Sequence, residues 1–106
     1  MTIDAIHDFA LSLPQTEASL PFGPDVMVYK AKGKMFLLVP LNTTPLQFNV
    51  KCQPEIAIEL REQYPNTVLP GYHMNKKHWN TIIINGLLNA QQLKQFIQNS
   101  YNLVFK

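Results

Sequence analysis

The sequence contains a single cysteine, Cys52, among 106 residues. One thiol excludes a disulfide within the chain and suits a reducing compartment. Long hydrophobic runs are also missing, because the longest nearly apolar stretch, Met35 to Leu41, is far too short to cross a bilayer. The first residues, MTIDAIHDF, have neither the basic nor the apolar region of a signal peptide. We therefore expect a cytoplasmic protein with no membrane partner.

Catalytic and metal-binding motifs are equally scarce. The sequence has no Walker loop, nucleophile elbow, HExxH motif or Cys-x-x-Cys pair, and its seven acidic residues are scattered over three segments. A zinc site made from Cys52, His73 and His78 would lack the usual ligand spacing, because the two histidines do not share one helical face. We therefore expect a binding protein rather than an enzyme, without a cofactor or a metal.

Charged residues make up only 15% of the chain, and hydrophobic residues make up 46%. This composition is typical of a folded domain, and the length leaves room for one core, so we expect a single domain over residues 1–106. The net charge of +2 is too small to indicate nucleic-acid binding by itself. Its distribution is uneven, however, since residues 1–25 carry only acids while residues 26–51 and 63–106 carry only lysines. Such segregation can produce one basic surface.

Hydrophobic periodicity predicts three helices, at residues 3–13, 54–63 and 90–102, and about five strands. The strands are expected near residues 17–20, 26–30, 35–40, 46–52 and 81–85, with a turn at Lys32-Gly33 and a capping box of Asn89 and Gln92. The order is helix, four strands, helix, strand, helix. It predicts an α+β domain in which helices cover one antiparallel or mixed sheet.

Side-chain patterns indicate which faces are buried. Strand 35–40 is apolar at both its odd and its even positions, so it should be central in the sheet and covered on both faces. Cys52 falls at one of the alternate positions of strand 46–52 whose side chains should point into the core, which favours a buried thiol over a nucleophile. His7 lies at the edge of the first helix's apolar face, which favours a packing role. The second helix should pack through Ile56, Ala57, Leu60 and Tyr64 and expose a stripe of Glu55, Glu59 and Glu62.

Residues 70–80, PGYHMNKKHWN, concentrate reactive and aromatic side chains more than any other stretch. Asn75 is expected to cap a helix whose first turn is Lys76 to His78, with Met74 and Trp79 as a hydrophobic staple. Lysines at a helix N-terminus are unfavourable unless an anion such as phosphate binds among them. The alternative is one exposed turn that tolerates solvated lysines at little cost.

Four stretches of the chain carry a family resemblance: LPFGPDV at 20–26, GKMF at 33–36, KCQPEIAIELREQYP at 51–65 and PGYHMNKKHWNT at 70–81. They resemble the MmcQ/YjbR family of small bacterial proteins, and the resemblance covers nearly the whole chain. It implies an α/β fold related to the double-wing domain of a phage transcription factor, from which DNA binding is usually inferred. This implication rests on fold analogy.

Two hypotheses for function follow. The first is a monomeric nucleic-acid-binding module that holds phosphate through Asn75, Lys76 and Lys77, with hydrogen bonds from His73 and His78 and further charge from Lys30, Lys32, Lys34 and Lys51. The second is a module that recognises a small anionic or phosphorylated ligand, or a protein, through the same residues. Lysines spread over one broad surface would favour the first hypothesis, and lysines around a closed pocket would favour the second.

Overall fold

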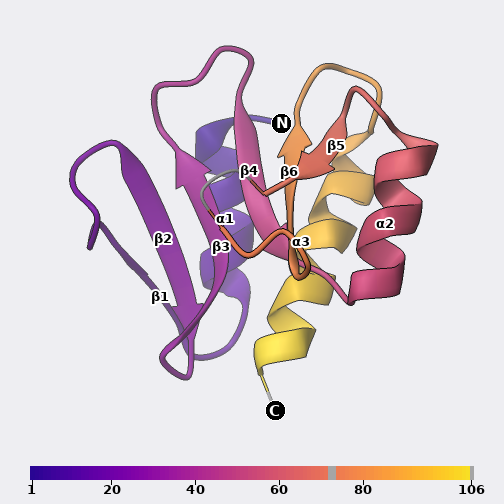
Figure 1. The fold of residues 1–106 in the computed structure, drawn as a ribbon. Coiled ribbons are helices and arrows are strands. Elements are labelled where there is room, and N and C mark those ends of the chain that lie inside the picture. The colour runs from indigo at the N-terminus through magenta and orange to yellow at the C-terminus, as the bar shows by residue number, and fades with distance from the viewer. Residues whose placement is uncertain (72–73, 106) are drawn as a thin grey trace.

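The computed structural model describes residues 1–71 and 74–105, which form three helices and six strands (Figure 1). The elements are α1 (Ile3–Ser12), β1 (Thr16–Ser19), β2 (Val26–Ala31), β3 (Lys34–Pro40), β4 (Gln47–Lys51), α2 (Pro54–Gln63), β5 (Val68–Pro70), β6 (Trp79–Ile83) and α3 (Ala90–Val104). The strands make one sheet in the order β1-β2-β3-β4-β6-β5, and every neighbouring pair is antiparallel. The predicted α+β class is confirmed.

Strand β5 is the element that the hydrophobic pattern missed. It has three residues, ends at Pro70 and pairs only with β6 at the edge of the sheet. So short a segment shows no alternation, and proline is typical of an edge strand because it donates no hydrogen bond. The prediction for β6 was also displaced, since this strand begins at Trp79 and ends at Ile83 rather than covering residues 81–85.

Local signals explain the elements that were predicted well. The Thr2 hydroxyl accepts a hydrogen bond from the Ala5 amide at 3.1 Å and caps α1. Lys32 and Gly33 have φ values of 52° and 78°, the left-handed pair that a tight turn between β2 and β3 requires. At α3, the Asn89 side chain accepts from the Gln92 amide at 2.8 Å, and the Gln92 side chain accepts from the Asn89 amide at 2.9 Å. The predicted capping box is therefore confirmed.

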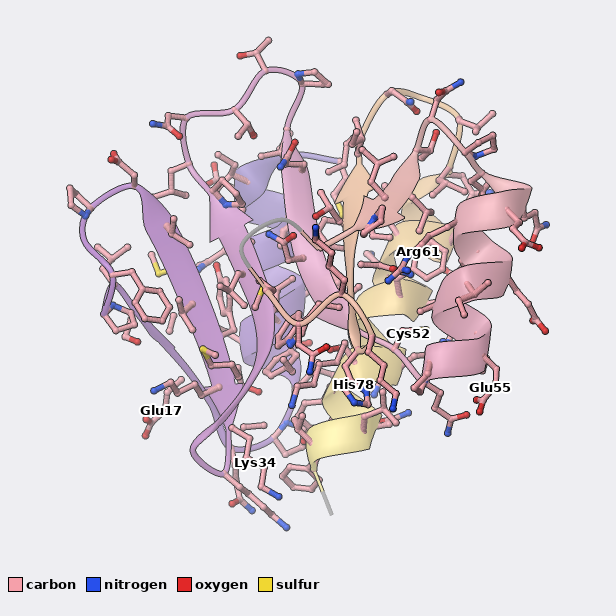
Figure 2. The ribbon with its side chains drawn as sticks, viewed as in Figure 1. Glu17, Lys34, Cys52, Glu55, Arg61 and His78 are labelled. Carbon is pink, nitrogen blue, oxygen red and sulfur yellow. The ribbon has the colours of Figure 1, made fainter. Side chains whose placement is uncertain are left out.

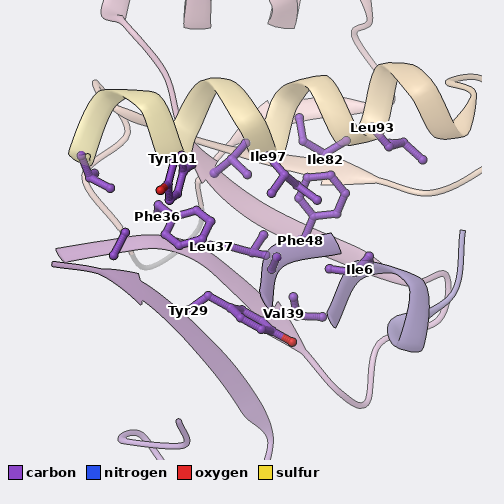
Figure 3. Close-up of a cluster of buried hydrophobic side chains, with 14 of the residues drawn as sticks. Ile6, Tyr29, Phe36, Leu37, Val39, Phe48, Ile82, Leu93, Ile97 and Tyr101 are labelled. Carbon is purple, nitrogen blue, oxygen red and sulfur yellow. The ribbon is translucent and has the colours of Figure 1, made fainter. Parts of the chain in front are cut away.

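The main core lies between the sheet and the two helices α1 and α3 (Figure 3). Strand residues such as Phe36, Phe48 and Ile82 pack there, together with Ile6 from α1 and a seam from α3 that includes Leu93, Ile97 and Tyr101. At the edge of α1, His7 Nδ1 lies 2.8 Å from the Tyr29 hydroxyl, which confirms the packing role predicted for this histidine. Burial raises the pKa of Tyr29 to about 12.

The opposite side of the sheet, which we call the open face, has a second and smaller cluster of Val28, Leu38 and Trp79. Met35 and Met74 pack against this cluster. Residues 74–78, which lead into β6, lie over this face where the described helices do not reach (Figure 1). Strand β3 is therefore covered on both sides, as its apolar sequence predicts, but one cover is a short segment without regular structure.

Helix α2 stands at the β5 edge of the sheet and packs less completely than predicted. Ala57 is fully buried, and Leu60 and Tyr64 pack against the main core. Ile56, however, is 44% exposed, so its predicted place in the packed side is wrong. The reason is that α2 covers an edge rather than a face, so that only a narrow strip of the helix meets the sheet.

The capping box of α3 supports a stability prediction. Replacing Asn89 by alanine should lower the free energy of unfolding by about 1 kcal/mol, because the Gln92 amide loses its acceptor. Urea unfolding followed by circular dichroism measures this change. Gln91→Ala, at an exposed position in the same turn, is the control and should stay within about 0.5 kcal/mol of the original. Equal losses in both variants would contradict a capping role.

Candidate functional site

Backbone hydrogen bonds hold the two ends of the segment that precedes β6. The Gly71 amide donates to the Trp79 carbonyl at 2.9 Å, and the Cys52 amide donates to the His78 carbonyl at 2.7 Å. A Cβ atom on Gly71 would lie 2.8 Å from the Trp79 Cβ and 3.1 Å from its carbonyl oxygen. Only glycine allows this approach, so the close contact of the two ends depends on the absence of a side chain at position 71.

Arg61, the only arginine in the chain, holds the same segment from α2 (Figure 2). Its Nε donates to the Asn80 side-chain oxygen at 2.7 Å, and its Nη2 donates to the carbonyls of Lys76 and Trp79, the latter at 3.3 Å. Asn80 is itself buried and donates to the Ala57 carbonyl at 3.4 Å. The only signal for this role in the sequence is a single arginine within the acidic stripe of α2, to which the sequence alone assigns no function.

The predicted helix at Asn75 is not formed. The Asn75 side chain accepts from the Lys77 amide at 3.0 Å, and its carbonyl accepts from the amides of His78 and Trp79 at 3.1 and 3.0 Å. This single turn passes directly into β6, because Trp79 pairs with Lys51 of β4. The Lys77 and His78 amides, which were expected to help bind an anion, already have acceptors within the turn, and no helix begins at Asn75 to provide the site. Met74 packs against the small cluster that contains Trp79, but the helix of the predicted staple is not formed.

A hollow of about 480 Å³ lies beside this turn and brings together three of the predicted site residues, Lys51, Asn75 and His78. We call it the basic hollow; Cys52, Gln53 and Trp79 also line it. The Lys51 ammonium lies 5.6 Å from the centroid of the Trp79 ring. A cation over an aromatic face is attracted to the ring but keeps its charge, so Lys51 can still attract an anion.

The other predicted lysines lie outside the basic hollow. Lys76 borders a separate hollow beside Gln47 and Thr81, and Lys30 and Lys32 border a third one beside β1. Lys34 and Lys77 are exposed. His73 lies outside the described residues. The predicted lysines therefore do not surround one closed pocket.

Antiparallel pairing nevertheless brings most of these lysines to one end of the sheet. The β2–β3 turn, the last residue of β4 and the first residue of β6 share this end, and Figure 2 shows Lys34 and His78 there. We call it the basic end; it carries Lys32, Lys34, Lys51, Lys77 and His78. The ammonium of Lys32 lies 4.2 Å from the centroid of the Phe105 ring, close to the end of α3.

Cys52 differs from the sequence prediction, because it is half-buried rather than buried. It lies one residue beyond β4, where the chain turns towards α2. Burial raises the pKa of its thiol, which keeps the thiol protonated near neutral pH and argues against a nucleophile. Within residues 1–71 and 74–105, no three histidine, cysteine or acidic side chains are grouped to hold a metal ion. No helix in the same ranges is long and apolar enough to span a membrane.

Comparison with known proteins places this fold and this segment in a family. A model of the YjbR family matches residues 11–103. The chain belongs to the YjbR family. It is 40% identical over 96 residues to YbdF of Escherichia coli O157:H7, covering 90% of this chain and 77% of that protein. It is 29% identical over 101 residues to YjbR of Escherichia coli K12, covering 95% and 85% of the two chains. The family resemblance seen in the sequence is confirmed.

Solved structures agree with the fold. The crystal structure of the Deinococcus radiodurans protein DR2400 superposes with a TM-score of 0.92 at 34% identity, covering 97% of this chain and 78% of that one. A Pseudomonas syringae protein superposes with a TM-score of 0.79 at 28% identity, covering 98% and 99% of the two chains. The arrangement of sheet and helices is thus shared with these proteins.

The Arg61 contacts lead to a prediction for this YjbR-family chain. Arg61→Ala should lower the free energy of unfolding by about 2 kcal/mol, because it removes charge-assisted hydrogen bonds and leaves Asn80 without a donor. Chemical unfolding measures the loss. Glu62→Ala, at the next residue of α2, which is exposed to solvent, should change stability by less than about 0.5 kcal/mol. A loss no larger for Arg61→Ala than for Glu62→Ala would show that Arg61 does not hold the segment.

Proposed function

We propose that the chain binds nucleic acid by contacting its phosphate backbone with the basic end of the sheet. The observation that carries this proposal is the meeting of lysines from three separate stretches of sequence. Lys32 and Lys34 come from the β2–β3 turn, Lys51 from the end of β4, and Lys77 from the turn before β6. Several cations on one accessible end can contact successive phosphates, which is the main source of affinity in nucleic-acid binding.

The positions of the acidic residues support this choice. Glu55, Glu59 and Glu62 are exposed on α2 at the edge of the molecule, and Figure 2 shows Glu55 on the outer side of that helix. Asp4 and Asp8 belong to α1, on the far side of the sheet from the open face. Glu17 is the exception, because it lies directly across from Lys30 in the β1–β2 pair. Lys30, and to a smaller extent Lys32, which borders the same hollow as Glu17, should therefore contribute less than Lys34, Lys51 and Lys77.

The residues of the basic hollow have distinct roles in this proposal. Lys51 supplies a positive charge whose position is fixed by the Trp79 ring, and His78 and Asn75 supply polar groups beside it. A phosphate oxygen held there would orient the strand, and the exposed lysines would contact its neighbours. These are contacts to phosphate and carry no base recognition, so we expect binding with little dependence on sequence.

A long polyanion fits the lysines better than a small phosphorylated ligand does. Of the lysines that the structure describes, Lys51 alone lines the basic hollow, whereas Lys32, Lys34 and Lys77 lie outside it. A small ligand in the hollow would therefore leave most of the charge unused. The resemblance to the double-wing domain points to DNA as well, by fold analogy.

Salt-dependent binding tests the proposal. The logarithm of the affinity for duplex DNA should fall linearly with the logarithm of salt concentration, with a slope of about 0.9 for each phosphate contact. Lys51→Gln should reduce that slope by about one unit and weaken different duplex sequences equally. Lys94→Gln removes the same charge from α3, where the ammonium lies 5.7 Å from the Phe9 ring centroid, and should leave the slope unchanged.

Two results would contradict the proposal. One is the absence of binding to duplex or single-stranded DNA at low salt, where charge attraction is strongest. The other is an equal loss in Lys51→Gln and Lys94→Gln, which would indicate attraction by total charge instead of a defined end. Saturable binding of a mononucleotide without any binding to DNA would support the small-anion hypothesis in its place.

A further inference from the structure

The open face contains a second hollow of about 480 Å³ that is chemically unlike the basic hollow. Its walls include Phe22, Val26, Met35, Leu38 and Met74. Every described residue that lines it is uncharged. We call it the apolar hollow. A cavity of this size is in the range that small ligands occupy, and an uncharged lining favours a neutral ligand.

The apolar walls of this hollow come from four different parts of the chain, and β4 and β6 add polar side chains. Leu38 belongs to β3, Val26 begins β2, and Met74 approaches from the segment that leads into β6. Phe22 lies in the connection between β1 and β2 and is 65% exposed. Two methionines and an exposed phenylalanine provide adaptable contacts to an aromatic ring, since thioether sulfur packs well against ring edges.

One polar side chain in this hollow has an unused hydrogen-bonding group. Asn49 is only 8% exposed, and its side-chain oxygen accepts from the Thr81 hydroxyl at 2.5 Å. Both residues line the apolar hollow. Among the residues that the structure describes, none accepts a hydrogen bond from the Asn49 amide nitrogen. A ligand in the hollow that carries an acceptor would bind this donor.

We propose that the apolar hollow is a binding site for a neutral aromatic molecule with a carbonyl group, the ring packing against Met35, Leu38 and Met74 and the carbonyl accepting from Asn49. This site is separate from the basic end, so it does not depend on nucleic-acid binding. The ligand class follows from three features together: the uncharged side chains among the described lining residues, the two methionines in the walls, and the Asn49 amide donor, which is the more deeply buried of the two amides that line the hollow, Gln47 being the other.

Prodan, a neutral naphthyl ketone whose fluorescence shifts to shorter wavelength in apolar surroundings, is a suitable probe. Titration with the full chain should give a saturable blue shift with one molecule bound per chain. In ¹⁵N-resolved NMR spectra, the side-chain amide signals of Asn49 should move as prodan binds. A fluorescence change that never saturates, or unmoved Asn49 signals in a saturated complex, would overturn the proposal.

Substitutions in and outside the apolar hollow test whether prodan binds there. Phe22→Ala should weaken prodan about fivefold, the equivalent of one aromatic contact. Leu87→Ala removes an equally exposed apolar side chain, 62% exposed and outside the hollow, and should bind as the original does. Met35→Trp should fill the hollow and weaken binding by more than about tenfold, with the melting temperature measured in parallel. Equal effects of Phe22→Ala and Leu87→Ala would overturn the assignment even if Met35→Trp does not fold.

A ligand pair tests the carbonyl contact without altering the protein. 2-Acetylnaphthalene should displace prodan at a lower concentration than 2-ethylnaphthalene, although the ethyl compound is the more apolar of the two. This order requires a hydrogen-bond donor in the site, which Asn49 supplies. The reverse order would indicate simple apolar partitioning and would overturn the proposed contact.

Discussion

The placement of Trp79 is the constraint on which both hollows depend. Its side chain is 5% exposed and packs against Val28 and Leu38 on the open face. Its carbonyl accepts hydrogen bonds from the Gly71 amide and from Arg61, and its ring lies beneath the Lys51 ammonium. One residue thus joins the sheet, the segment before β6 and α2. The Cys52 amide, which donates to the His78 carbonyl, and Arg61, which donates to the Lys76 carbonyl, hold the same segment beside it.

The segment that Trp79 anchors also separates the two kinds of surface. Met74 forms part of the apolar hollow, whereas Asn75 and His78, only one and four residues later, line the basic hollow. The two proposals therefore assign a neutral ligand and a phosphate backbone to different hollows, which this one segment borders. Because the segment lines both, a ligand that changes the position of Met74 would act through the same backbone that carries His78.

The sequence predicted those features that depend on local chemistry. Apolar spacing located the three helices, and the Lys32-Gly33 turn and the Asn89 cap were recognised from their residue types. Features set by distant pairing were missed or wrong. An asparagine cap and an apolar pair at Asn75 suit a helix and a single turn equally well, and pairing of Trp79 with Lys51 decides between them. The hydrogen bonds of Arg61 reach residues 15 to 19 positions away, so no local pattern reveals them.

The fluorescence of Trp79, the only tryptophan, tests most directly whether this anchor exists in solution. The native protein should emit at a shorter wavelength than the unfolded chain and resist quenching by acrylamide, because the ring is buried. Gly71→Ala, which places a methyl group against Trp79, should move the emission towards that of the unfolded chain and increase quenching while far-ultraviolet circular dichroism is retained. Native emission at the unfolded wavelength, or fluorescence unchanged by Gly71→Ala, would contradict the account.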